Sequence, residues 1–331
     1  MATTTNYCFE TLTINAFLKK VNQPNFKDLV FQEFKQLATI SLKGTTDNFS
    51  KKENSHKNRW YDIPCWDHSR VILTSHGSQI HNHSNSDPSA IIVTNRDSDS
   101  TYIHANFVDG YEEPSKFICC QAPKEITAGD FWKLIWQEDV HTIVSLTETD
   151  EGDICFEYWV QEEGFKLIFG RYVIETLEIK EEVGFVTTRL RLTDITCQDS
   201  RIITHFWYVN WPNYGVPTHL EEFVTLLTEV NEHQRKLVEE AELYDHRKPG
   251  PIVVHCSAGV GRTGSFCSID YAIDQLNKEN TISLQNTVLK IREMRHSSVV
   301  TPEQYMFLYN IIEYLLPKTK QDGEGMCAHT L

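Results

Sequence analysis

The sequence is short of positive charge and of long hydrophobic runs. It contains 31 Lys and Arg residues against 46 Asp and Glu, so the formal net charge is −15 at pH 7. A chain this acidic is a poor candidate for broad binding to nucleic acid or to anionic membranes, although one local anion pocket needs only a few donors. No run reaches the roughly 18 apolar residues that cross a bilayer. We therefore expect neither nucleic-acid binding nor membrane insertion.

Signals for secretion, disulfide bonds and lipid anchors are missing as well. The N-terminal stretch MATTTNYCFETLTINAFLKK has no apolar core of a signal peptide. The nine cysteines are odd in number and none forms a C-x-x-C pair, which favours reduced, mostly buried thiols in a cytoplasmic protein. Cys327 is the fifth residue from the end and misses the four-residue prenylation box by one position. Nothing in the pattern indicates the oligomeric state.

What is present is the pattern of one α/β domain with a mixed sheet and surrounding helices. Short runs rich in valine, isoleucine, threonine and aromatics alternate with amphipathic segments, and no internal repeat or linker divides the chain. Helices are expected at 26–38, 128–138, 219–244, from about 263, and in two more segments that end near 316. Strands are expected at 90–95, 117–122, 141–147, 165–179, 185–195, 201–211 and 251–255, and a loop at 75–90. We expect an N-terminal extension over 1–22, the domain over 23–316 and a polar tail over 317–331.

The stretch PIVVHCSAGVGRTGSF carries the chemistry. A short apolar strand at 252–254 runs into a loop with glycines, and the loop opens a helix. Such a loop points backbone N–H groups at one spot and the helix dipole adds positive potential, so it forms an anion cradle. Cys256 lies at the mouth of this cradle, where a thiolate is favoured. Arg262 offers a planar fork that matches two oxygens of a phosphate. The alternative is a buried cysteine in an ordinary turn, whose arginine caps a neighbour.

These residues resemble the signature of the classical protein-tyrosine phosphatases, which HCSAGVGRTG matches without a gap. The resemblance extends over about 26–316. KNRW with DIPCWDHSRV is similar to the family's phosphotyrosine-recognition loop, and TYIHANFVDGY to its DYINAN segment. FICCQAPKEITAGDFWKLIWQE is similar to the family's IATQGP segment, WPNYGVP to its mobile acid loop and VTPEQYMFLY to its glutamine loop.

The resemblance implies a twisted mixed sheet flanked by helices. It also implies that phosphotyrosine proteins are dephosphorylated through a phosphocysteine, with no metal or other cofactor. Cys256 would be the nucleophile and Arg262 the phosphate clamp. His255 would help to keep the thiolate, and Thr263 would hydrogen-bond its sulfur. The rest of the phosphate-binding loop would consist of Ser257, Ala258, Gly259, Val260 and Gly261.

Two residues of the recognition segment have alternative interpretations. Trp60 stands where the family usually has a tyrosine, so its ring could stack on the phosphotyrosine and deepen the pocket, or it could pack in the core. Asp62 would bind backbone amides of the substrate peptide, or it could cap a turn.

Three positions depart from the family pattern. Asn213 occupies the place of the general acid, and an amide can neither protonate the leaving phenolate nor take a proton from water. Another acid could supply the proton, but the stretch VNWPNYGVP contains none. Val300 replaces the first glutamine of the glutamine loop, which helps to position water, while Gln304, the second, is retained. Ile154 stands where a lysine is common.

The first functional interpretation is therefore a protein-tyrosine phosphatase with reduced turnover. The second is a pseudophosphatase that binds and shields phosphotyrosine proteins. A third, a lipid or dual-specificity phosphatase, is disfavoured because Trp60 would deepen the pocket. The compact chain with its substituted acid loop also resembles, more weakly, the tyrosine phosphatases of bracoviruses of parasitoid wasps. That resemblance would imply action in the cytoplasm of a host insect cell, on immune or cytoskeletal signalling.

Overall fold

A ten-stranded mixed sheet forms the centre of the molecule. The computed structural model describes residues 9–74, 88–93, 100–147, 155–212 and 215–316, so Asn213, Ile154, the tail and most of the predicted loop at 75–90 lie outside it. In spatial order the strands are β2 (Arg70–Ile72), β4 (Tyr102–Gly110), β5 (Glu113–Gln121), β11 (Ile252–Cys256), β6 (Thr142–Ser145), β10 (Asp199–Tyr208), β9 (Phe185–Asp194), β8 (Tyr172–Glu181), β7 (Lys166–Phe169) and β3 (Ala90–Val93). The expected single α/β domain is confirmed.

The phosphate-loop strand lies in the parallel middle of this sheet. Strand β11 pairs in parallel with β5 on one side and with β6 on the other, and β6 pairs in parallel with β10. All five residues of β11 are buried. A parallel strand covered on both faces reads as a continuous apolar run, which is why the sequence identified this strand directly.

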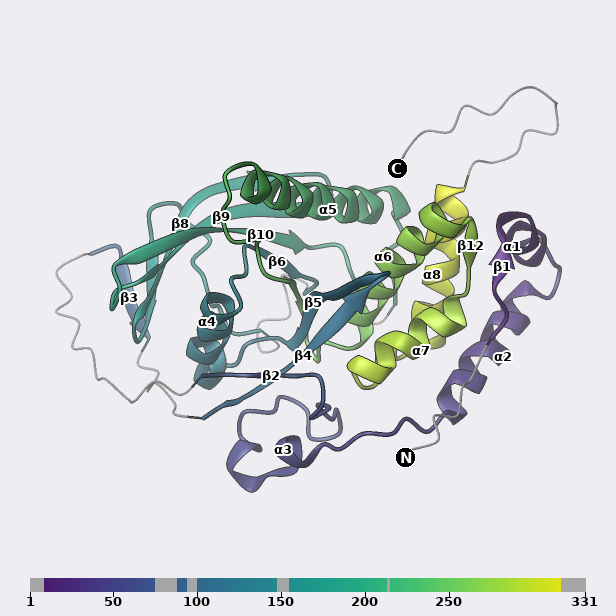
Figure 1. The fold of residues 1–331 in the computed structure, drawn as a ribbon, viewed down its shortest axis with the longest axis horizontal. Coiled ribbons are helices and arrows are strands. Elements are labelled where there is room, and N and C mark those ends of the chain that lie inside the picture. The colour runs from purple at the N-terminus through teal and green to yellow at the C-terminus, as the bar shows by residue number, and fades with distance from the viewer. Residues whose placement is uncertain (1–8, 75–87, 94–99, 148–154, 213–214, 317–331) are drawn as a thin grey trace.

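Helices cover both faces of the sheet (Figure 1). One face carries α5 (Leu220–Leu243), α6 (Gly261–Glu279), α7 (Leu284–Met294) and α8 (Pro302–Leu315), and the other carries α4 (Ala128–Gln137). Short turns α3 (Asp47–Ser50), η1 (Lys52–Asn54) and η2 (Glu125–Thr127) lie in the connections. The helices expected from amphipathic spacing are all found. The segment expected as one strand at 165–179 divides into β7 and β8, because Gly170 turns the backbone at a φ of 56°.

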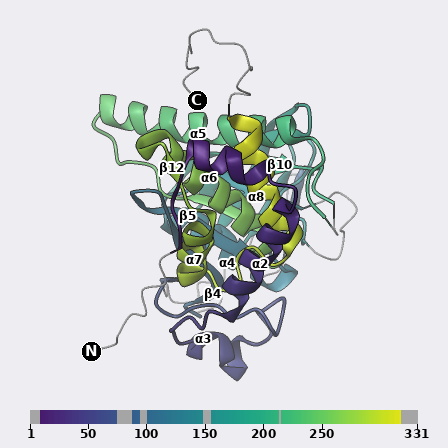
Figure 2. The same ribbon diagram turned by 90° about the vertical axis from the view of Figure 1, so that its right-hand side faces the viewer.

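The N-terminal segment packs on the domain, which its weak patterning did not indicate. Strand β1 (Leu12–Thr13) pairs with β12 (Thr281–Ile282), and helices α1 (Ile14–Val21) and α2 (Phe26–Thr39) lie beside α8 (Figure 2). Phe17 is fully buried and stacks on Tyr309 with ring centroids 5.5 Å apart. Tyr305 and Tyr309 both donate to the Glu33 carboxylate. Part of the expected extension over 1–22 is therefore integral to the packed core.

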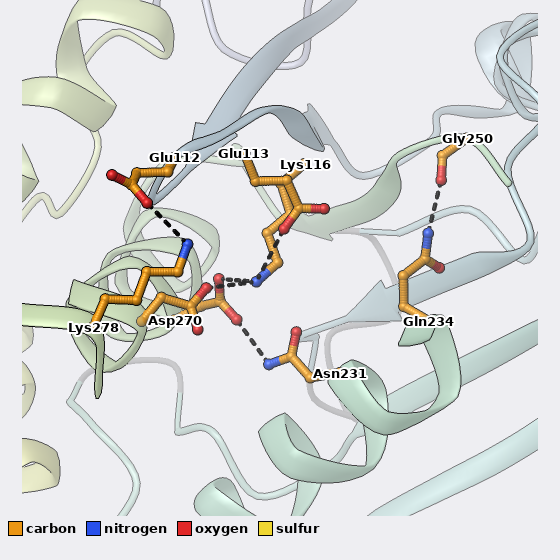
Figure 3. A network of polar contacts seen from close by, with 9 residues as sticks. Glu112, Glu113, Lys116, Asn231, Gln234, Gly250, Asp270 and Lys278 are labelled. Carbon is orange, nitrogen blue, oxygen red and sulfur yellow. Dashed lines mark hydrogen bonds and ion pairs between the residues drawn. The ribbon is translucent and has the colours of Figure 1, made fainter. Parts of the chain in front are cut away.

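A buried ion cluster fixes α6, the helix that opens at the phosphate loop. Lys116 on β5 donates to Asp270 on α6 at 2.6 Å and to Asp274 at 3.1 Å. Asn231 on α5 donates to the other oxygen of Asp270 at 2.7 Å, so one carboxylate joins a strand and two helices (Figure 3). Lys116 and Asp270 are both nearly inaccessible to solvent. This cluster holds α6 in register against β5, and therefore against β11.

Candidate active site

The phosphate-binding loop connects the end of β11 to the first turn of α6. Cys256 is the last residue of β11 and is only 4% exposed. Gly259 has a φ of 68°, and a Cβ placed on it would lie 2.0 Å from the carbonyl oxygen of Cys120. Glycine is therefore required here for both the backbone angle and the close approach to β5. The amide of Ala122 donates to the carbonyl of Ser257 at 2.9 Å and joins the loop to the end of β5.

Arg262 lies in the first turn of α6, as the spacing predicted. Its side chain is buried, and Nη1 donates to the carbonyl oxygen of Leu146 at 2.9 Å, just past β6. That bond orients the guanidinium at the helix N-terminus. Cys256 and Arg262 thus lie at the two ends of one loop, and both are held by the central parallel strands.

His255 is neutral, which changes how it can support the sulfur. It is fully buried, and its Nε2 lies 2.6 Å from the hydroxyl of Tyr158, which also lies 2.8 Å from Nε2 of His205. Burial lowers the pKa of His255 to about 4. At neutral pH the imidazole therefore carries no charge. Its contact with the nucleophile residue is through the backbone, since Nδ1 lies 3.4 Å from the carbonyl oxygen of Cys256 at the end of β11.

The hydroxyl of Thr263 does not make the expected bond. Thr263 is fully buried, and its Oγ1 has no hydrogen-bond partner among the described residues. The predicted bond to the sulfur of Cys256 is therefore not formed in this structure. An unpartnered buried hydroxyl costs free energy.

Trp60 lies beside the phosphate-binding loop and not in the core. It is 42% exposed, and its Nε1 donates to Oγ of Ser257 in the phosphate-binding loop at 3.3 Å. The alternative of a core tryptophan is therefore wrong. Asp62 is exposed two residues further on, and its carboxylate caps no backbone group within the described part of the chain. The turn-cap alternative is thus not realised there.

The retained glutamine touches the phosphate-binding loop. Oε1 of Gln304 accepts from the amide of Val300 at 2.9 Å, and a Cβ on Gly261 would lie 2.8 Å from Nε2 of Gln304. Val300 itself is 48% exposed beside this contact. Asn213 lies outside the described residues. Close to it, Trp211 is fully buried and donates to the carbonyl of Gly215 at 3.3 Å, which anchors the base of the predicted acid loop.

Sequence reasoning missed two groups of residues around the site. Arg295 is fully buried and donates to the carbonyl oxygens of Ala258 and Gly259, each at 2.9 Å. The second group is Tyr158 and His205: the Tyr158 hydroxyl is hydrogen-bonded to the imidazoles of both His255 and His205. An arginine near the end of an amphipathic helix normally indicates a solvated surface. No local signal therefore marked Arg295 as part of the loop's support.

Comparison with known proteins agrees with this geometry. Residues 54–314 match the sequence model of the family described as "Protein-tyrosine phosphatase". The chain belongs to the protein-tyrosine phosphatase family. The resemblance to bracovirus enzymes is also confirmed, as the similar proteins show.

Three similar proteins illustrate the relationship. Tyrosine phosphatase H3 of Microplitis demolitor bracovirus (isolate Webb) is 53% identical over 311 residues, which cover 94% of this chain and 96% of that protein. Tyrosine phosphatase-like protein H1 of the same virus is 44% identical over 307 residues, with coverage of 92% and 86%. Tyrosine-protein phosphatase non-receptor type 9 of Rattus norvegicus is 32% identical over 324 residues, or 97% of this chain and 51% of that longer protein.

Of the helices within the described part of the chain, none combines the length and the apolar character needed to cross a bilayer.

Proposed function

We propose that the protein removes phosphate from tyrosine residues of proteins through a phosphocysteine on Cys256. The observation that carries this proposal is the loop between the buried residues Cys256 and Arg262, to whose half-buried Ser257 the exposed Trp60 is hydrogen-bonded. Loop amides at a helix N-terminus bind a phosphate dianion, and a guanidinium matches two of its oxygens. The half-exposed indole offers an aromatic face for a phosphotyrosine ring.

Two displacements at phosphorus complete the proposed reaction. The thiolate sulfur of Cys256 attacks phosphorus, an S–P bond forms, and the P–O bond breaks with its electron pair on the tyrosine oxygen. The released phenolate takes a proton from solvent. Water then attacks the phosphocysteine and loses a proton to solvent, the P–S bond breaks, and the thiolate is regenerated as inorganic phosphate leaves. The proposal requires no cofactor.

Turnover is reduced in this proposal because proton transfer is impaired. A phenolate is a poor leaving group, since its conjugate acid has a pKa of about 10. The amide of Asn213 cannot protonate it, and general acid–base help is worth about 10²–10⁴ in rate. Val300 further removes a group that positions water for the second step. Ser257, Ala258, Gly259, Val260, Gly261 and Arg262, which would hold the phosphate, carry no comparable substitution.

The second candidate function is a pseudophosphatase that binds and shields phosphotyrosine proteins. The same two positions, Asn213 and Val300, favour it, because they remove proton transfer and spare phosphate binding. Asp62, exposed next to Trp60, is proposed to bind backbone amides of the bound peptide in either case.

The relatives suggest where the protein acts. Since proteins named as tyrosine phosphatases of a bracovirus cover nearly all of the chain, we propose that it acts in the cytoplasm of a host cell. Its partners there would be tyrosine-phosphorylated proteins of host signalling and immunity.

Phosphate release over time tests the proposal. The substrates are a phosphotyrosine peptide and p-nitrophenyl phosphate, whose leaving group needs little protonation. We expect slow release by the parent, none by Cys256→Ser, and unchanged release by Cys197→Ser, which alters an exposed cysteine outside the site. Phosphopeptide binding should persist in Cys256→Ser. Binding without any release by the parent would favour the pseudophosphatase, and full release by Cys256→Ser would refute the nucleophile.

A further inference from the structure

Two buried residues connect the phosphate-binding loop to the loop that carries Trp60. Arg295 follows α7 directly and is fully buried, and His104 is buried in the middle of β4. The reaction proposed above uses neither of them. Their hydrogen bonds nevertheless reach both loops, which come from distant parts of the sequence.

Arg295 holds the phosphate-binding loop through its backbone. Nε donates to the carbonyl oxygen of Gly259 and Nη2 to that of Ala258, each at 2.9 Å. Nη1 donates to Oδ1 of Asn106 on β4 at 2.7 Å. These partners are uncharged, so a complete guanidinium charge lies buried beside the loop that would receive an anion. The orientation of the guanidinium depends on the groups that accept hydrogen bonds from its remaining N–H donors.

His104 accepts from Arg295 with one ring nitrogen and donates with the other. Its Nδ1 lies 3.1 Å from Nη2 of Arg295, and its Nε2 lies 2.9 Å from the carbonyl oxygen of Ile63. A guanidinium has only donors, so Nδ1 must be the acceptor, and a carbonyl only accepts, so Nε2 must carry the proton. Burial and the Arg295 charge lower the pKa of His104 to about 3. The neutral tautomer is therefore the one present at neutral pH.

Ile63 belongs to the same loop as Trp60. On the other side of Trp60, this loop is attached to Gln121 at the end of β5. The Gln121 amide accepts from the backbone of Arg59 at 2.9 Å and donates to the carbonyl of Lys57 at 2.7 Å. Trp60 therefore lies between two attachments, one made by Gln121 and the other by His104.

We propose that His104 is a positioning residue that couples these two loops. Through Arg295 it holds the carbonyls of Ala258 and Gly259, and through Ile63 it holds the segment that carries Trp60. An imidazole can do this because its two nitrogens point in different directions on a rigid ring. His104 thereby sets the distance between the aromatic face and the phosphate cradle without touching substrate. The inference rests on the proposed function, since it assigns these loops to phosphotyrosine.

Three substitutions separate the two bonds of His104. His104→Asn places an amide oxygen near Nδ1, so it keeps an acceptor for Arg295 and loses the bond to Ile63. His104→Gln places an amide nitrogen near Nε2 and does the reverse, and His104→Ala loses both. We expect the asparagine variant to raise the KM of a phosphotyrosine peptide by about 5–30-fold with kcat nearly unchanged. The glutamine variant should instead lower kcat by a similar factor, and the alanine variant should change both.

Hydrogen–deuterium exchange of the free protein tests the coupling without relying on turnover. Exchange should rise in peptides covering 57–63 for His104→Asn, in those covering 256–261 for His104→Gln, and in both for His104→Ala. His233→Ala is the control, because this half-buried imidazole on α5 lies in neither loop and its Nε2 has no hydrogen-bond partner among the residues that the structure describes. It should leave both segments unchanged.

The exchange data also distinguish a failure of this inference from a failure of the proposed function. Unchanged exchange in either loop of His104→Ala would overturn the coupling, and so would a rise spread evenly over the whole protein. If the parent has no turnover but the His104 variants show the predicted exchange pattern, the proposed enzyme activity fails and the coupling stands.

Discussion

The carbonyl oxygen of Cys120 occupies the space that any side chain on residue 259 would need. A Cβ on Gly259 would lie 2.0 Å from this oxygen, and the carbonyl belongs to the backbone of β5, so it cannot move independently. Strand β5 pairs directly with β11, the strand that ends at Cys256. The shape of the phosphate cradle is therefore fixed by contact with the neighbouring strand.

Gly259→Ala should consequently lose activity and stability together. The left-handed backbone alone costs about 1–2 kcal/mol for an alanine, and the overlap with Cys120 forces the loop to move. The control is Gly164→Ala, which shares a positive φ of 83° but has nothing within 4 Å of the new Cβ. Urea denaturation and phosphopeptide binding should show a larger loss at 259. Equal effects of the two variants would contradict the contact with Cys120.

Arg262→Ala should weaken phosphopeptide binding as well as turnover. In the proposed role the guanidinium would contact both the bound phosphate and the group in transfer, so KM should rise while kcat falls by about 10²–10³. Arg262→Lys should recover little, because a point charge does not reproduce the planar fork. Calorimetric titration in a Cys256→Ser background measures binding alone. Arg235→Ala, an exposed helical arginine paired with Glu239, is the control. Unchanged affinity in Arg262→Ala would show that the clamp is misassigned.

Stability should fall as the pH drops from about 6.5 towards 4. Burial lowers the pKa of His255 to about 4 and that of His104 to about 3, and it also lowers the pKa of His205. Below pH 6.5 the unfolded chain binds protons at these positions and the folded protein does not, so acid favours unfolding. Each histidine contributes up to about 1.4 kcal/mol per pH unit. Urea denaturation between pH 7.5 and 5 measures the slope.

The variant His255→Asn separates one of these contributions from the carboxylates that also titrate. Its stability should depend less steeply on pH than that of the parent over the same range. Parallel slopes for the two proteins would mean that His255 is protonated in the folded state.

Lys116→Met should destabilise the protein by about 3–5 kcal/mol. The substitution leaves the buried carboxylate of Asp270 near Asp274 without a neutralising cation. Removing one partner of a buried ion pair typically destabilises a protein by this amount, because the other charge stays buried and unpaired. The double variant Lys116→Met with Asp270→Asn should recover part of the loss, since it removes the uncompensated charge. Lys248→Ala, which breaks an exposed pair with Glu242, should change the free energy of unfolding by less than about 1 kcal/mol. If Lys116→Met lowered the free energy of unfolding by no more than Lys248→Ala does, the stabilising role of the cluster would be contradicted.

The sequence was most informative where the determinants are local. Cys256, Arg262 and the glycines between them lie within one strand–loop–helix unit, so their spacing alone predicts the cradle. The central strands could also be predicted because strands buried on both faces are continuous apolar runs, and the long helices because their buried positions recur with the helical period. Strand β4 was not expected, since its buried positions include His104 and Asn106, whose polarity breaks the usual pattern.

What the sequence could not reveal depends on contacts between distant segments. His104 and Arg295 are 191 positions apart, and only the fold shows that they share a hydrogen bond. The burial of Phe17 likewise depends on its stacking with Tyr309 near the other end of the chain. His104 and Arg295 were not predicted to be buried, because a single sequence does not show which polar groups find hydrogen-bond partners. Phe17 was not predicted to be buried because its helix is too short to show a clear apolar period.

The central claim is that the chain has all the residues that would bind phosphate but lacks the carboxyl group that would transfer protons. Asn213→Asp restores a carboxyl group at the general-acid position and changes little else in size. Because Val300 is still in place, the gain in kcat on a phosphotyrosine peptide should be about 10–10³, below the full general-acid contribution. Phosphopeptide affinity should stay the same or weaken slightly, since an anion now faces the phosphate.

The most direct measurement is therefore kcat and KM of the parent and of Asn213→Asp on two substrates, a phosphotyrosine peptide and p-nitrophenyl phosphate. We predict a large rise in kcat for the peptide, a smaller one for the nitrophenyl ester, whose leaving group departs without a proton, and a new acidic limb in the pH profile. No rise in kcat on either substrate would contradict the claim that the missing carboxyl group is what limits turnover.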